Sequence, residues 1–553
     1  MAHPTPGDAG RPSAPDRTAP VVRARVTPRP EPPFDRLFDA VTQDLVSDGP
    51  LARERFVTRW RDTAALRRLA EAKRAPLEAA LARELGGYHR RLGASERTLA
   101  ALESLASGGA VCAVAGQQPA PLGGPLYTLH KIAAAVGAAE AVRERTGMPC
   151  VPVFWMHGED SDFEEVRTAT FAGPGLLLEQ RSLPADAHVP GGLLGAVPAA
   201  GLAEIGESAL AAWQGLPGVA AVAELLHGAH GRGRDLGEAF SALVLALFGR
   251  QGVVVVDPRL PAFRAAARPV LERYLARAGD LAAAARAAGA WLEEQGARRA
   301  LPDAALESFV FALEDGVRRK LTLAEARGAA GRGTLVPSVA LRPVVQDAVL
   351  PSVAMTCGPG EIAYLAQLRE VFGGLDVRAA CLLPRLGVTW LPPAATALLA
   401  ASDAEPWELV SDADAVLRRL AEREIPAAAR AELEAARRGA NDGLERLAQA
   451  ARELDASLPQ MVESARGKVD YQFQRLFEGL AAKARHRLER AHPEWPRLRH
   501  YLLPGDRLQE RRLASLEIVA HRGAGVVDDL CGWAAAHARG LGDGVHEHLV
   551  AEL

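Results

Sequence analysis

The sequence predicts an α/β protein with a Rossmann-like parallel-sheet core, two inserted connecting lobes and a C-terminal α-helical antiparallel coiled coil. First, an apolar run ending at Ala115 leads through a Gly/Pro-rich loop into an Ala-rich helix and then a second apolar run, which favours a parallel sheet. Second, the valines of 253–256 lie between Gly252 and Asp257-Pro258, a pattern typical of a central parallel strand. Third, leucines recur at helical steps on both sides of Leu458-Pro459.

Composition excludes several classes of function. The net charge of −3 and the aromatic content of 5% argue against a nucleic-acid partner. The sequence has no run of about 20 apolar residues, so no membrane span is expected. The N-terminal region lacks the apolar segment of a secretory signal. The five cysteines are scattered without a CxxC pair, which predicts a reducing, cytoplasmic location and no metal site.

The chain divides by composition into a tail, a core and a helical region. Residues 1–33 are rich in Pro, Ala and Arg and are predicted to be a disordered tail. The Rossmann-like core is expected over 34–392, with inserts at about 164–233 and 262–335. The remaining 393–553 are expected to form the coiled-coil domain and a C-terminal segment, with an ordinary helical bundle as the alternative to the coiled coil.

Within the core, the elements are read in order from their patterns. A helical region covers 34–107, and the first insert contains some antiparallel β-structure. Strands are expected at 111–115, 149–155, 253–256, 353–355 and 379–383. Helices are expected at 126–145, 236–248, 262–295 and 362–372.

The loop after the first strand is the strongest functional signal. Gly116 and Gly124 allow a backbone to approach a ligand closely, and N–H groups at the start of the following helix suit an anion. His130 and Lys131 lie in the first turns, where they can stabilise developing charge. Gln117, Gln118, Pro125 and Tyr127 complete the candidate loop. The alternative is an ordinary helix turn with a solvated lysine.

The second strand ends in an acidic run. His157, Glu159, Asp160 and Asp162 follow it directly, at the sheet edge where α/β proteins bind ligands. The carboxylates can hold an ammonium group, bind Mg²⁺ with a nucleotide or act as a base for an attacking amine. The alternative is a solvated acidic turn.

Further candidates lie at the later strand ends. Gly358, Gly360, Glu361 and Tyr364 form a second loop that opens into a helix. Asp257 ends the valine-rich strand, where it is either a site wall or a helix start. Arg342 and Arg385 are candidate clamps for carboxylates, since a guanidinium grips a carboxylate with two bonds, and a structural salt bridge is the alternative for each.

Several of these runs together resemble one family, the cysteine ligases of bacillithiol biosynthesis (the BshC family). The matching runs occur in order at Val114 to Lys131, Val151 to Phe163, Leu341 to Gln346, Gly358 to Gln367, Leu383 to Leu386 and Leu508 to Arg511. One departure is Ser161, where the family has a histidine. If this stretch is helical, His157 shares a face with position 161 and can substitute for that histidine.

The resemblance implies a reaction and partners. It implies a homodimer formed through the coiled coil, and a ligase that joins the carboxyl of L-cysteine to the amine of glucosaminyl-malate. A free carboxylate is a poor electrophile, so ATP is a candidate activating cosubstrate, with Mg²⁺ left open and no permanent cofactor expected. His130, Lys131, Glu159 and Asp160 are the expected catalytic residues. The alternatives are an adenylyl- or nucleotidyl-transferase acting on another small acid and a non-catalytic dimerising scaffold.

Overall fold

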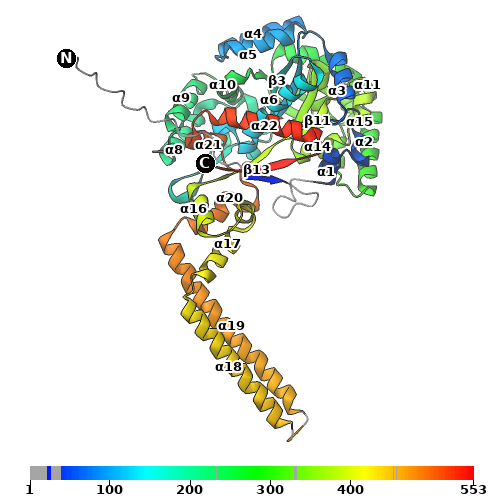
Figure 1. Ribbon diagram of the computed structural model, residues 1–553. Helices are drawn as coiled ribbons and strands as arrows, with labels where there is room; N and C mark the ends of the chain where they lie inside the picture. The colour runs from blue at the N-terminus through cyan, green and yellow to red at the C-terminus, as the bar shows by residue number, and fades with distance from the viewer. Residues whose placement is uncertain (1–21, 26–38, 232, 329–332, 453, 456) are drawn as a thin grey trace, which may run out of the picture.

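The computed structural model describes residues 22–25, 39–231, 233–328, 333–452, 454–455 and 457–553. A broad α/β body carries a long arm of two helices (Figure 1). The tail predicted over 1–33 lies outside the described residues except for Val22–Arg25. Those four residues form strand β1 in place of the predicted disorder, because β13 (Glu547–Glu552) supplies antiparallel hydrogen-bond partners.

A five-stranded parallel sheet forms the centre of the body. Its strands are β2 (Val111–Gln117), β3 (Cys150–Met156), β6 (Val254–Val256), β10 (Ser352–Cys357) and β11 (Cys381–Pro384). The spatial order is β11-β10-β2-β3-β6, and every pairing is parallel. From β2 the chain first adds β3 and β6 on one side of the sheet, and later adds β10 and β11 on the other side. The strand order therefore reverses between β2 and β10, and α/β proteins bind ligands at the carboxyl ends of the strands that flank such a switch point. The Rossmann-like fold class is confirmed.

Helices cover both faces of the sheet and give it a buried core. One face packs against α3 (Thr63–Lys73), α6 (Leu126–Thr146), α10 (Leu236–Phe248) and α22 (Val526–Gly542). The other packs against α5 (Glu96–Ala106), α11 (Pro261–Glu294), α13 (Arg342–Val349), α14 (Pro359–Leu365) and α15 (Arg369–Gly374). Because both faces are covered, the strands are continuous apolar runs rather than alternating ones. The remaining N-terminal helices are α1 (Ala40–Ser47), α2 (Pro50–Arg55) and α4 (Ala79–Arg91).

The single helix expected over 362–372 is wrong, because α14 and α15 are separate helices. The break falls at Gln367, which is fully buried. Its side-chain Oε1 accepts hydrogen bonds from the backbone N–H groups of Ala300 and Leu301, at 2.7 and 2.8 Å. The chain turns here and places that amide against the segment that follows α11.

Two inserts flank the sheet. The first contains α7 (Phe163–Val166), the antiparallel pair β4 (Thr168–Ala172) and β5 (Leu178–Ser182), α8 (Leu202–Ala212) and α9 (Val219–Ala229). After α11, the second contains an antiparallel sheet of β7 (Val310–Glu314), β8 (Val317–Lys320) and β9 (Thr334–Pro337), with α12 (Leu323–Gly328). This small sheet places charged side chains beside the carboxyl edge of the main sheet.

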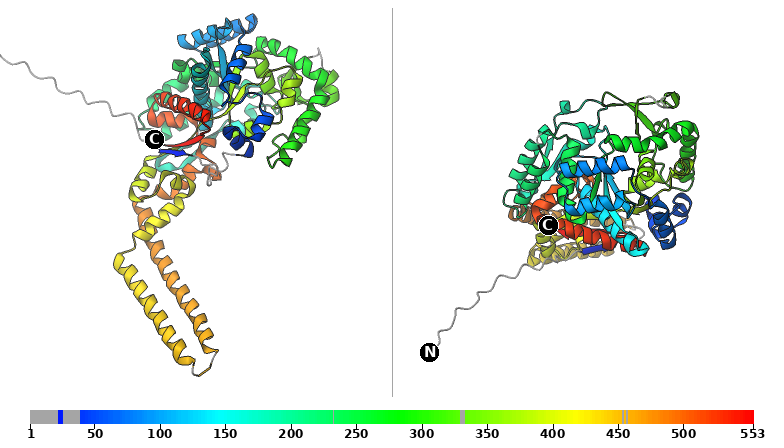
Figure 2. Two further views of the ribbon diagram at one scale, coloured as in Figure 1. Left: turned by 45° about the vertical axis from the view of Figure 1, so that its right-hand side comes forward. Right: turned by 90° about the horizontal axis from the view of Figure 1, so that it is seen from above.

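The C-terminal region leaves the body and then returns to it. It begins with β12 (Gly387–Leu391), α16 (Pro393–Ala401) and α17 (Pro406–Arg423). The arm is the antiparallel pair α18 (Ala427–Ala451) and α19 (Leu458–Ala491), seen extending below the body in Figure 2. The chain re-enters the body through α20 (Leu498–Leu502), α21 (Ser515–Arg522), α22 and β13, which pairs with β12.

The arm has a thin apolar seam. Among the described residues of α18 and α19, the buried ones are Ala448 and Val462. Polar contacts supplement the seam, with Arg437 Nε 2.8 Å from Asp470 and Arg466 2.6 Å from Glu445. Across the described part of the chain, no helix has both the length and the apolar character needed to cross a membrane.

Candidate active site

Lys131 connects the ends of two central strands. Its Nζ donates to the carbonyl of Gly116 at 2.9 Å and to Oε1 of Gln117 at 3.0 Å, both at the end of β2. The same Nζ lies 2.6 Å from Oε2 of Glu361, on the first turn of α14 beyond β10. Glu361 in turn accepts a 2.8 Å hydrogen bond from the N–H of Gly358. Two of the predicted loops are therefore joined by one buried ammonium group.

The two glutamines extend this network toward β3. Nε2 of Gln117 donates to Oε1 of Gln118 at 2.6 Å and to the hydroxyl of Tyr127 at 3.1 Å. Nε2 of Gln118 donates to Glu165 at 2.8 Å and to Asp160 at 3.4 Å. The loop after β2 and the acidic run after β3 thus belong to one polar network.

The acidic run faces basic side chains from three other elements. Oε1 of Glu159 lies 3.0 Å from the guanidinium of Arg264 on α11. Asp160 pairs with Arg318 of β8 at 3.3 Å and with Arg342 of α13 at 3.8 Å. Burial raises the pKa of Glu159, and although Arg264 lowers it, the pKa is about 7. This carboxyl therefore exchanges a proton near neutral pH.

These residues surround a cavity of about 550 Å³, a size suited to a small molecule. Its lining includes His157, Glu159, Asp160, Ser161, Asp162, Phe311, Arg318, Lys320 and Arg342. Arg318 and Lys320 were not among the residues predicted from the sequence, and neither was Arg264. The basic run Arg318-Arg319-Lys320 in the second insert could have indicated an anion-binding segment. Nothing in the sequence, however, places that insert against the acidic run.

His157 lies at the cavity wall, packed closely against β2. A Cβ at Gly116 would come within 2.3 Å of Nε2 of His157, so the imidazole needs a glycine there. Burial lowers the pKa of His157 well below its usual value, and the positive charges of Arg342 and Lys131 lower it further. The imidazole is therefore neutral near pH 7.

The stretch from His157 to Ser161 is not helical, because α7 begins only at Phe163, so the condition under which the two residues would share a helical face is not met. The preceding residues form a turn in which the N–H of Asp160 donates to the carbonyl of His157 at 3.2 Å. Both His157 and Ser161 nevertheless line the cavity. Asp162 lies at its edge and caps α7 by accepting a hydrogen bond from the N–H of Glu165.

At the start of α6, two of the N–H groups that the sequence led us to expect as free already have partners. The N–H of Leu126 donates to the carbonyl of Leu513 at 2.8 Å, and that of Thr128 donates to the carbonyl of Pro125. The carbonyl of Gly124 accepts from the N–H of Ser515. The returning C-terminal segment therefore covers this helix start. The sequence signal at Gly124 and Pro125 reflects this packing, and Gly124 has a φ of 72° that favours glycine.

His130 and Arg385 meet in a buried cluster formed by the same C-terminal segment. Arg385 donates to both carboxylate oxygens of Glu510, at 2.8 and 2.6 Å, and Nδ1 of His130 lies 3.2 Å from Oε2 of Glu510. Burial raises the pKa of Glu510, but Arg385 and His130 outweigh that effect and hold the pKa well below its usual value. Neither His130 nor Arg385 lines the cavity, and Arg385 forms the structural salt bridge that was the alternative to a carboxylate clamp.

The remaining predicted residues have mixed placements. Asp257 is buried and held by Arg259, which lies 2.7 Å from its Oδ2, so it forms a salt bridge rather than a cavity wall. Tyr364 on α14 is hydrogen-bonded to Arg342, and burial raises its pKa. A Cβ at Gly360 would meet nothing within 4 Å. Among the described residues, no group of three or more His, Cys, Asp or Glu side chains is arranged to hold a metal ion.

Comparison with known proteins gives matches over nearly the whole chain. The family model described as "Bacillithiol biosynthesis BshC, N-terminal Rossmann-like domain" matches residues 35–332 and 326–386. The model described as "Bacillithiol biosynthesis BshC, C-terminal coiled-coil domain" matches residues 388–538.

Curated relatives agree with the family models. A protein of Solibacter usitatus is 31% identical over 440 residues, covering 76% of this chain and 82% of the relative. A protein of Koribacter versatilis is 31% identical over 458 residues, covering 80% and 85%. A protein of Symbiobacterium thermophilum is 29% identical over 488 residues, covering 81% and 86%. Each is named "putative cysteine ligase BshC". The chain described here belongs to the BshC family of bacillithiol biosynthesis, the cysteine ligase family.

Proposed function

We propose that this protein forms the amide bond between the carboxyl of L-cysteine and the amine of glucosaminyl-malate. The observation that carries the proposal is the 550 Å³ cavity at the carboxyl edge of the sheet, whose walls carry opposite charges. Glu159 and Asp160 form its acidic part, and Arg318 and Arg342 its basic part. The substrates have matching groups, since cysteine brings an ammonium and the malate portion brings carboxylates.

The charges of the lining support a proposed place for each substrate. The carboxylates of the malate portion bind Arg318 and Arg342, because a guanidinium makes paired hydrogen bonds to a carboxylate. Lys320, on the same strand as Arg318, adds a further positive charge to the cavity. The cysteine ammonium binds the acidic run at Asp160. Gln118, which donates to Asp160, keeps that carboxylate oriented.

We propose ATP as the activating cosubstrate, which would convert the cysteine carboxylate into an acyl-adenylate with release of pyrophosphate. The amine nitrogen of glucosaminyl-malate then forms a C–N bond to the acyl carbon, and the C–O bond to AMP breaks. The attacking amine must lose a proton, and Glu159 is the side chain placed to accept it, because its pKa of about 7 lies near the working pH. Lys131 holds the loop after β2 and the loop after β10 in a fixed position relative to each other.

The arm supports a homodimer as part of this proposal. Large apolar side chains on it are exposed, at 55% for Leu447, 84% for Leu454, 65% for Met461 and 57% for Leu476. Exposed apolar surface of this extent on a two-helix arm suits a second copy of the same arm. In analytical ultracentrifugation, the wild type is expected at twice the chain mass. Replacing Leu454 and Met461 with lysine is expected to give the single-chain mass, whereas a dimer unchanged by both substitutions would exclude this surface.

An assay with purified protein tests the reaction. Pyrophosphate release from ATP is measured with L-cysteine alone, with glucosaminyl-malate alone and with both, and the amide product is followed by mass spectrometry. The ligase proposal expects product with both substrates and pyrophosphate release that requires cysteine. Pyrophosphate release with another small acid but not with cysteine would instead indicate an adenylyl-transferase. Product formation without ATP would overturn the activation step alone.

A further inference from the structure

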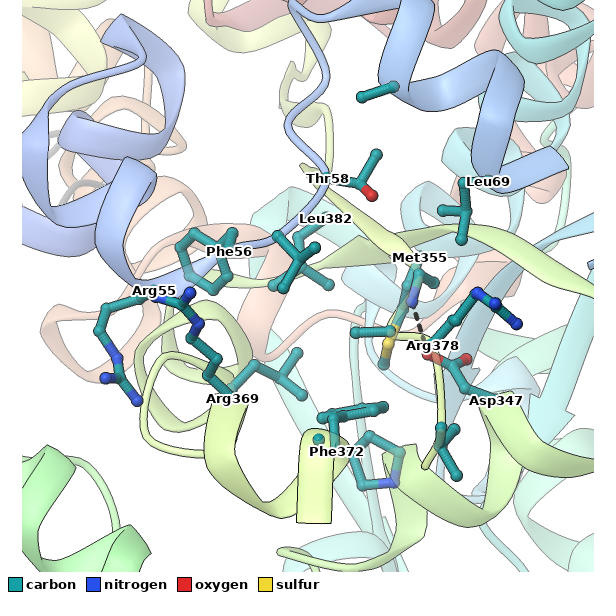
Figure 3. Close-up of a pocket in the computed structure, with 18 of the residues that line it drawn as sticks. Arg55, Phe56, Thr58, Leu69, Asp347, Met355, Arg369, Phe372, Arg378 and Leu382 are labelled. Carbon is teal, nitrogen blue, oxygen red and sulfur yellow. Dashed lines mark hydrogen bonds between the residues drawn. The ribbon is translucent and has the colours of Figure 1, made fainter. Parts of the chain in front are cut away.

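A second cavity lies at the edge of the sheet and is separate from the candidate active site. Its volume is about 610 Å³. It lies beside β11, the edge strand, between α3 on one side and α15 on the other (Figure 3). Its floor is apolar and includes Phe56, Leu69, Met355, Phe372 and Leu382.

The cavity lies toward the opposite end of the strands from the active site. Asp347 and Arg378, which line it, precede β10 and β11 in the chain, whereas Gly358 and Arg385 follow those strands. None of its lining residues also lines the cavity around Asp160. A ligand here would therefore not overlap a substrate in that cavity, although α13 lines both, through Arg342 on one side and Pro343 on the other.

Four arginines line the cavity, and two of them are neutralised. Arg55 pairs with Glu370 on α15, and Arg369 pairs with Glu54. Figure 3 shows these two guanidinium groups beside Phe56, and Arg378 near the opposite end of the cavity. The uncompensated positive charge of the cavity therefore lies at the end that carries Arg378, away from the two paired arginines.

Arg68 and Arg378 make no ion pair with any carboxylate of the described residues. Among the described residues, Asp347 is the one carboxylate that lines the cavity, so the two unpaired guanidinium groups face one negative charge and the lining remains net positive. Oδ1 accepts from the hydroxyl of Ser352 at 2.5 Å, and Oδ2 accepts from the N–H of Ala380 at 2.7 Å. Lys73, which does not line the cavity, donates to the backbone carbonyl of Asp347.

We propose that this cavity binds a small organic anion. The apolar body of the ligand would lie on Met355, Phe372 and Leu382, and its anionic group would meet Arg68 and Arg378. The volume is within the range of small-molecule sites, about 300–1,000 Å³. Guanidinium groups without a protein partner suit a carboxylate, sulfonate or phosphate. The unpaired charge makes an anion the matching occupant rather than a neutral apolar molecule.

The test uses the full chain and the fluorescent probe 8-anilinonaphthalene-1-sulfonate, which combines an aromatic body with one negative charge. The double variant Arg68→Gln/Arg378→Gln is expected to weaken probe binding by about tenfold, the equivalent of two charge-assisted hydrogen bonds at an exposed rim. Arg67→Gln, on the same helix but outside the cavity, is the matched control. A neutral probe, N-phenyl-1-naphthylamine, is expected to bind both variants and the wild type equally.

A second variant tests the apolar floor without removing charge. Ala72→Trp, on the exposed side of α3 within the cavity lining, is expected to block the probe, whereas Ala64→Trp on the same helix is expected to leave binding unchanged. Displacement by octanoate or by phenyl phosphate then identifies which anionic group the site prefers. Equal probe affinity in the wild type, the double arginine variant and Ala72→Trp would overturn the proposal. Since the readout is binding, the result is independent of ligase activity.

Discussion

The ammonium of Lys131 lies 2.6 Å from the carboxylate of Glu361, and this pair joins the loop after β2 to the helix after β10. Both side chains are largely buried, with 6% and 15% of their surface exposed. The two loops lie on adjacent strands at the switch point of the sheet. The pair therefore joins the two loops at the point from which the polar network extends through Gln117 and Gln118 to Asp160.

Lys131→Met is expected to lower the free energy of unfolding by about 3 kcal/mol, because it leaves the carboxylate of Glu361 buried without its partner. Product formation should fall with it, since Gln117 and the carbonyl of Gly116 also lose their donor. Denaturant unfolding measures the first effect. The double variant Lys131→Met/Glu361→Gln should recover part of the loss, and the exposed control Glu144→Gln on α6 should change stability by about 0.5 kcal/mol or less. A loss of stability in the double variant equal to the sum of the losses in Lys131→Met and Glu361→Gln would contradict the pairing.

Glu510→Gln is expected to destabilise the protein by about 3 kcal/mol, because Arg385 and His130 would lose a buried carboxylate that both contact. The effect should exceed that of Asp403→Asn, which breaks an exposed pair with Arg423. Urea unfolding of the two variants provides the comparison. Equal stability of both would show that the buried Glu510 cluster does not stabilise the C-terminal segment.

The raised pKa of Glu159 leads us to expect that both stability and activity depend on pH, each in a defined direction. Its pKa is about 7 in the folded protein, against an ordinary value of 4.5, because burial disfavours the charged form. Between those values the native state holds a proton that the unfolded state has released, so stability falls as the pH rises from about 4.5 to 7. If Glu159 is the base, kcat/KM should rise through pH 7 as the carboxylate forms.

Glu159→Gln should remove the rise in kcat/KM and flatten part of the stability profile. Glu517, whose pKa burial also raises to about 7, provides the matched control because it contacts Tyr501 and the N–H of Ala172 and does not line the cavity. Glu517→Gln should alter the stability profile and leave the rise in kcat/KM in place. Loss of that rise in both variants would remove Glu159 from the role of base.

Two glycine substitutions compare the closely packed end of β2 at Gly116 with the open loop after β10 at Gly360. Gly116→Ala would place a Cβ 2.3 Å from His157, so we expect it to displace the imidazole at a cost of about 1–3 kcal/mol. Gly360→Ala meets nothing within 4 Å and should be tolerated. Thermal melting and turnover of the two variants test this contrast, and a severe defect in Gly360→Ala would mean that a ligand approaches that backbone closely.

The sequence predicted the layered core because the buried strands are continuous apolar runs and the helices between them have clear periodicity. The sequence also identified Lys131, Glu361 and Asp160 as candidate site residues, because polar residues at the ends of neighbouring parallel strands converge at one edge of the sheet. It did not reveal Arg318, because contact between the second insert and the acidic run depends on tertiary packing. It also did not show that Leu513 covers the start of α6, since that contact spans most of the chain.

The central claim is that substrate binds in the cavity between the acidic run and Arg318 and Arg342. The most direct measurement is the KM for each substrate in Arg318→Gln/Arg342→Gln, with amide product followed by mass spectrometry. The account predicts a KM for glucosaminyl-malate raised by about tenfold or more, with the KM for L-cysteine changed far less. Wild-type KM values for both substrates in a folded double variant would contradict it.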